Sequence, residues 1–208
     1  MKKFFLISMT IIISVSMVLI GAGCKTAAQP TVPEFNGGDF EITLPENWEG
    51  AKKEELDSVI ENLNKAGLSK LADVVDANRD YLVFFGYDAE VIEENGNVNI
   101  FTITGESKVV LSLQEYMDIS YESVAEQYEK AKYTFNIVEQ EIVALGDNEE
   151  VGRTIFEQTV ESNETKVAQY IIKNGSDFWI LTFSTDLEQF DENLQDFDAA
   201  IETFKILD

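Results

Sequence analysis

Residues 166–184 constrain the fold more than any other part of this chain. Residues 166–173 and 178–184 predict two strands, and Asn174-Gly175 between them predicts a tight two-residue turn, because a type I′ turn needs positive φ at both central residues. The predicted cross-strand pairs are Lys173 with Ser176, Ile171 with Phe178, and Tyr170 with Trp179. Bulky apolar side chains therefore lie on both faces of the sheet, which predicts helices on both sides.

Residues 185–204 predict a helix that covers one of these faces. Thr185 to Glu188 fits a capping box, which marks a helix start. An apolar stripe follows at steps of three and four residues and consists of Leu187, Phe190, Leu194, Phe197, Ile201 and Phe204. We expect this stripe to pack in the core, because a helix packed on its own sheet is commoner than one that binds a partner.

The remaining patterns predict one α+β domain with an antiparallel sheet between helices. Residues 40–44 alternate as a strand that Pro45 ends, with Trp48 close behind. A capping box at Ser112 predicts a helix that continues to about residue 131. The other expected elements are helices over 52–67 and 68–77, an interior strand over 81–87, a hairpin at Asn95-Gly96 into a strand over 98–104, and strands over 134–145 and 151–161.

The first residues have the pattern of an export signal. Lys2 and Lys3 precede an uncharged apolar run over residues 4–20, and small residues follow. This pattern predicts that the bulk of the chain works outside the cytoplasm.

Cys24 is the only cysteine in the chain. The sequence Gly21-Ala22-Gly23-Cys24 resembles the lipobox of bacterial lipoproteins, in which the cysteine takes a diacylglyceryl group and becomes the mature N-terminus. The resemblance implies cleavage between Gly23 and Cys24, although Gly21 stands where the family usually has a branched apolar residue. Two alternatives stay open: an uncleaved anchor helix, since 17 apolar residues reach the lower edge of a membrane span, and secretion with a free thiol at Cys24.

These features divide the chain into three expected parts. Residues 1–23 form a lipoprotein signal peptide, residues 24–38 form a lipidated flexible tether that holds two of the three prolines, and residues 39–208 form a single domain. The expected location is the extracytoplasmic face of the cell membrane, with the lipid as the membrane contact.

The net charge of the chain limits the classes of partner that it can bind. Its formal net charge is −24, and removal of the leader takes away two lysines and no acid. Such an acidic surface disfavours nucleic acid, which rewards Lys and Arg, and keeps an exported protein soluble and monomeric.

The residue types argue against catalysis. The chain has no histidine, which removes histidine-based triads, histidine metal sites and the commonest general base. We expect no enzyme, no catalytic residue, no cofactor and no metal. The densest acidic loop, Asp147-Asn148-Glu149-Glu150, lacks the spacing of an EF-hand calcium loop and is expected to be a solvated turn.

The whole pattern resembles one known superfamily. A strand of the form F-x-I-x-L-P-x-x-W, here Phe40 to Trp48, opens the domain, and a helix that ends in Thr203-Phe204-Lys205 closes it. This is similar to the PsbP-like superfamily, which includes photosystem II extrinsic proteins, a Ran-binding release factor and DcrB-type bacterial lipoproteins. The resemblance covers about residues 39–207 and implies the fold, but it implies no shared catalytic site.

We therefore expect a non-enzymatic, lipid-anchored extracytoplasmic domain that binds or supports another component of the cell envelope. The alternative is a lipoprotein that binds a small ligand or a divalent cation. An export signal, a tether and the missing catalytic groups favour the first.

Overall fold

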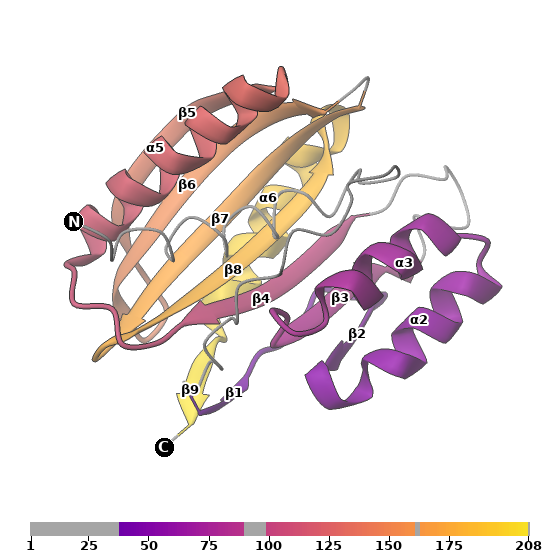
Figure 1. Cartoon of the computed structure of the whole chain (residues 1–208). Helices are drawn as coiled ribbons and strands as arrows, with labels where there is room; N and C mark the ends of the chain where they lie inside the picture. The colour runs from indigo at the N-terminus through magenta and orange to yellow at the C-terminus, as the bar shows by residue number, and fades with distance from the viewer. Residues whose placement is uncertain (1–37, 90–98, 161–162, 208) are drawn as a thin grey trace.

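The computed structural model describes residues 38–89, 99–160 and 163–207. The predicted signal peptide, Cys24, nearly all of the tether and the Asn95-Gly96 hairpin lie outside these residues. Figure 1 shows a long twisted sheet with helices on both faces. The helices are α2 (Leu56–Lys65), α3 (Ser69–Asn78), α5 (Leu113–Ala131) and α6 (Leu187–Glu202), with a short 3₁₀ turn at Lys53–Glu55.

The main sheet has seven antiparallel strands in the order β2-β3-β4-β8-β7-β6-β5. The strands are β2 (Trp48–Lys52), β3 (Phe84–Asp88), β4 (Ile100–Glu106), β5 (Thr134–Leu145), β6 (Asn148–Val160), β7 (Asn163–Asn174) and β8 (Asp177–Asp186). The two short strands β1 (Asp39–Glu41) and β9 (Lys205–Leu207) pair with each other in a separate sheet. The predicted fold class, an antiparallel sheet between helices, is confirmed.

The two faces of the sheet bury different sets of side chains. Helix α6 packs on one face, where Phe183, Phe197 and Trp179 are fully buried in one core cluster. On the other face, α5 covers the β5–β7 end and α2 with α3 covers the β2–β3 end (Figure 1). The predicted placement of the stripe in the core is confirmed for Phe190, Phe197, Ile201 and Phe204, which are at most 1% exposed. Leu187, the first residue of the stripe, is 36% exposed.

The hairpin between β7 and β8 differs from the predicted register. Tyr170 pairs with Leu181 and Ile171 with Ile180, so each partner lies two residues further along β8 than predicted. The reason is the position of the turn: Asn174 stays in the strand and pairs with Asp177, and Gly175, with φ of +61°, takes the first central position. A shift of two residues keeps each side chain on its predicted face, so the inference of two covered faces holds.

The predicted capping box at Thr185 is wrong. Helix α6 begins at Leu187 with Asp186 as its N-cap residue. Thr185 belongs to β8, where it is buried and its hydroxyl donates a 2.5 Å hydrogen bond to Asn99 Oδ1. The box at Ser112 is confirmed, because the Ser112 hydroxyl accepts from the Glu115 N–H and the Glu115 carboxylate accepts from the Ser112 N–H.

Two strands lie where the sequence predicts none. β2 has no β-branched residue, and β9 begins at Lys205, where the sequence predicts the end of the last helix. Both form because a partner strand is available, β3 for β2 and β1 for β9.

Among the described residues, no helix combines the length and apolarity that a bilayer crossing requires.

Candidate functional site

The outer strand β5 presents an open sheet edge. It is twelve residues long and is the last strand in the sheet order, so one side of its backbone pairs with β6 and the other pairs with no described strand. Residues 136–142 are all exposed. The opposite outer strand, β2, has only five residues. An exposed edge of this length leaves a row of backbone N–H and C=O groups that can pair with another extended chain.

The side chains of β5 make this edge partly apolar. Ile137, Val138 and Ile142 are 38%, 50% and 42% exposed. The pairing with β6 is interrupted at Val138 and at Ala144, and it is regular from Glu139 to Val143. Bulges of this kind bend and protect an edge, so the straight segment that remains available is 139–143.

The two faces of the 139–143 segment differ in chemistry. Ile142 pairs with Gly152, and a Cβ placed on Gly152 would point at Met117 and Leu113 of α5. Gln140 and Ile142 therefore lie on the α5 face. Glu139 and Glu141 alternate with them and lie on the α6 face. The α5 face of this segment therefore presents apolar and amide side chains, and its α6 face presents carboxylates.

Arg153 on β6 organises the acidic side. Its Nη1 lies 2.6 Å from Glu139 Oε1 and 3.1 Å from Glu141 Oε1, and its Nε lies 3.4 Å from Asp198 Oδ1 on α6. The Arg153 side chain is 12% exposed, whereas Glu139 and Glu141 are 46% and 43% exposed. The guanidinium is thus nearly covered, and both glutamates keep part of their surface open to solvent.

The environment of Arg153 favours its charged form. Burial alone would lower its pKa, but the charge of Asp198, the hydrogen bond with Tyr170 and the charge of Glu139 together outweigh burial, so the pKa of Arg153 lies above its ordinary value. Tyr170 donates a 2.6 Å hydrogen bond to Asp198 Oδ1. Burial, followed by this bond to a carboxylate, raises the pKa of Tyr170, so its hydroxyl stays a donor at neutral pH.

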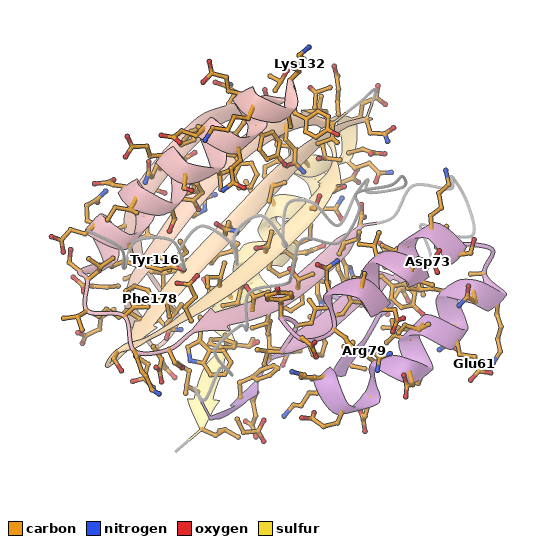
Figure 2. The ribbon with its side chains drawn as sticks, in the orientation of Figure 1. Glu61, Asp73, Arg79, Tyr116, Lys132 and Phe178 are labelled. Atoms are coloured by element: carbon orange, nitrogen blue, oxygen red, sulfur yellow. The ribbon has the colours of Figure 1, made fainter. Side chains whose placement is uncertain are left out.

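The α5 face contains a second polar feature, a row of side chains that crosses the sheet. Successive strand pairings place Thr102, Thr182, Gln169, Thr154 and Gln140 directly opposite one another. Within the row, Gln169 Nε2 donates to Thr182 Oγ1 at 2.9 Å, and Tyr121 of α5 donates to Gln169 Oε1 at 2.7 Å. The row thereby fixes α5 on the sheet, together with the stacking of Tyr116 on Phe178, labelled in Figure 2.

The acidic loop considered for calcium does not converge on one point. Gly146 and Asp147 form the turn between β5 and β6, and Asp147 Oδ2 lies 3.6 Å from Lys205 Nζ. Glu149 and Glu150 lie opposite Ala144 at the register shift between β5 and β6, and both are exposed. In the part of the chain that the structure describes, no group of three or more acidic, histidine or cysteine side chains is arranged to hold a metal ion.

One shallow depression lies next to this turn. Its volume is about 580 Å³, and its lining includes Glu41, Thr43, Asp147, Glu202 and Lys205. Thr203, also in its wall, accepts a 2.8 Å hydrogen bond from the Thr43 N–H and donates one to the Ala200 carbonyl. The polar groups of this wall are therefore partly occupied by contacts within the protein.

The structure adds Arg153 and the β5 edge to the predicted site residues. Gly23 and Cys24, the predicted cleavage and lipidation residues, lie outside the described residues. A signal for Arg153 does exist in the sequence: it alternates with Val151 and Ile155, so it lies on a core-facing side of β6 and needs a charged partner there. Nothing in the sequence shows which strand is the outer one.

Comparisons with known proteins place the fold. A scan against protein-family models and a search of curated proteins find no match. Among solved structures, cyanobacterial PsbP (CyanoP) from Synechocystis is similar with a TM-score of 0.53 and 13% identity, over 90% of this chain and 99% of that chain. LpqN of Mycobacterium tuberculosis, described as involved in cell envelope biogenesis, is similar with a TM-score of 0.45 and 7% identity, over 81% of this chain and 83% of that chain. Strand order, helix placement and the similarity to CyanoP together identify the fold of this chain as PsbP-like.

Proposed function

We propose that this chain is a non-enzymatic extracytoplasmic domain that binds another component of the cell envelope through the open edge of β5. The lipid on Cys24 holds it at the membrane, residues 24–38 form the tether, and residues 39–208 form the binding domain. The 139–143 segment is the surface on which an extended segment of the partner adds as an eighth strand of the sheet.

The exposed edge is the observation that carries this proposal. A long edge strand with exposed apolar side chains is a liability in a protein that only has to stay soluble. β5 exposes residues 136–142, whereas the inner strands β3, β4, β7 and β8 are mostly buried. Strand addition uses such an edge, since main-chain hydrogen bonds supply affinity and alternate side chains supply specificity.

The sequence supports the location and the lack of catalysis. The leader pattern and the lipobox-like Gly21 to Cys24 favour export and lipidation. Two acyl chains, at about 0.8 kcal/mol per buried CH₂, anchor a protein firmly. The absence of histidine and the position of the single cysteine at residue 24 leave no histidine or free-thiol chemistry for the domain.

A photocrosslinking experiment in intact cells tests the proposal. A photoreactive residue replaces Ile142 on β5 in one full-length variant and Asp73 on α3 in a control variant. We expect a discrete adduct with an envelope protein from position 142 and none from position 73. Equal crosslinking from both positions, or none from 142, contradicts docking at β5. Mass spectrometry of the mature N-terminus tests the anchor separately and is expected to find a diacylglyceryl group on Cys24.

A further inference from the structure

We infer that the partner segment accepted by β5 alternates apolar and basic side chains. This inference rests on the proposed docking at β5 and specifies the chemistry of its partner. It comes from the different character of the two faces of the 139–143 segment.

The acidic face has more negative charge than the protein itself neutralises. Glu139, Glu141 and Asp198 surround the single guanidinium of Arg153. The ion pairs of both glutamates, within the described part of the chain, are with this one residue. An added strand places its side chains directly opposite these half-exposed carboxylates, at the distance where opposite charges stabilise a cross-strand pair.

The α5 face of the 139–143 segment favours apolar side chains in the partner. Ile142 is 42% exposed and lies two residues from Gln140 on the same face. Further along that face, Ile137 is 38% exposed beyond the bulge. Because strand side chains alternate with a period of two, a segment with basic residues opposite Glu139 and Glu141 presents its intervening residues to Gln140 and Ile142.

The same charges disfavour a second copy of this chain as the occupant. An antiparallel pairing of two β5 edges centred on Gln140 would place Glu139 of one copy opposite Glu141 of the other. Like charges directly opposite each other destabilise a strand pair, and a net charge of −24 on each copy adds long-range repulsion. With a basic segment as the partner, both the cross-strand interaction and the long-range interaction become attractive.

Arg153 acts here as a positioning residue. Its Nη1 contacts both Glu139 and Glu141, which holds two otherwise flexible side chains on one side of the edge. Lower side-chain freedom before binding means that less ordering entropy is lost when a partner arrives.

Short synthetic peptides test the inference with the full-length protein in detergent. One peptide alternates isoleucine and lysine, and a second has threonine in place of each lysine. Binding of both is measured to the parent chain and to two variants that each lose two negative charges: Glu139→Gln with Glu141→Gln on β5, and Glu61→Gln with Asp73→Asn on α2 and α3. Figure 2 shows Glu61 and Asp73 on these two helices, which cover the β2 end of the sheet, away from β5.

We expect the lysine peptide to bind the parent chain about tenfold more tightly than the threonine peptide, as two partly exposed ion pairs imply. This preference is expected to disappear in the β5 variant and to persist in the α2–α3 variant. Persistence in the β5 variant would show general charge attraction and would overturn the inference. Thermal unfolding of both variants checks that they remain folded.

Hydrogen exchange of the β5 amides separates the inference from the docking proposal beneath it. If both peptides protect residues 139–143 and bind equally, the preference for basic residues is wrong and docking at β5 stands. If neither peptide protects these amides, docking at β5 is contradicted as well.

Discussion

The hydroxyl of Tyr121 on α5 donates a 2.7 Å hydrogen bond to Gln169 Oε1 on β7, and both residues are buried. Gln169 in turn donates to Thr182 on β8. A helix and two strands are thus joined through one amide side chain in the interior. The bond fixes the position of α5 on the same end of the sheet that presents the β5 edge.

Removal of the Tyr121 hydroxyl is expected to destabilise the domain. The variant Tyr121→Phe leaves a buried carbonyl oxygen of Gln169 without this donor, which costs about 1–3 kcal/mol of unfolding free energy. Urea denaturation measures the change. The control Tyr133→Phe, at a residue 36% exposed, is expected to change stability by less than about 0.5 kcal/mol. Equal effects of the two variants would contradict a specific role for the Tyr121 bond.

Gly146 is expected to be far less replaceable than Gly175. Both have positive φ, +59° and +61°, but a Cβ on Gly146 would lie 2.8 Å from Glu202 Cα, whereas Gly175 has no neighbour within 4 Å. Gly175→Ala is expected to cost about 1–2 kcal/mol from backbone conformation alone. Gly146→Ala is expected to cost about 1–3 kcal/mol more from steric overlap. Thermal or urea unfolding of the pair is the test, and equal losses would refute the close approach of the β5–β6 turn to the end of α6.

Alkaline pH is expected to destabilise the domain. Burial, followed by the hydrogen bond to Glu49 and the charge of that carboxylate, raises the pKa of Tyr87 to about 12. An unfolded tyrosine loses its proton near pH 10, so between pH 10 and pH 12 ionisation favours the unfolded state and stability falls. Below pH 10, Tyr87 is protonated in both the folded and the unfolded state, so its contribution to stability does not change with pH.

Urea unfolding of the parent chain and of Tyr87→Phe at pH 8, 10 and 11 measures this dependence. The parent is expected to lose more stability than the variant as pH rises. Parallel curves would mean that Tyr87 ionises alike in the folded and unfolded states.

Calcium is expected to leave the acidic turn unaffected. Asp147 lies near the ammonium group of Lys205, and no group of three or more carboxylates among the described residues is arranged to hold a metal ion. In millimolar Ca²⁺, the parent and a variant with Asp147→Asn, Glu149→Gln and Glu150→Gln are therefore expected to show the same change in melting temperature. A stabilisation of several degrees that only the parent shows would instead support the cation-binding alternative.

The sequence predicts the parts of this fold that depend on local pattern. The apolar stripe of α6 and the Ser112 capping box are confirmed because side-chain spacing and cap chemistry act within a few residues. The Thr185 box fails because a distant residue, Asn99, takes its hydroxyl. β9 is missed because three residues become a strand only when β1 lies beside them.

The docking edge is harder to predict because it depends on contacts between residues that are distant in sequence. Residues 134–145 are predicted as a strand, and the structure has the same bounds. Their place at the end of the sheet depends on the pairing of all the other strands. The cluster around Arg153 likewise joins the neighbouring strands β5 and β6 to α6, which is distant from them in sequence.

Amide hydrogen exchange of residues 139–143, measured in the full-length protein with and without its crosslinked envelope partner, tests docking at β5 most directly. The account predicts that exchange of the outward-facing amides of this segment slows by at least about tenfold, as new backbone hydrogen bonds form. Unchanged exchange over 139–143, with protection at another surface such as the depression around Glu41 and Lys205, would contradict it.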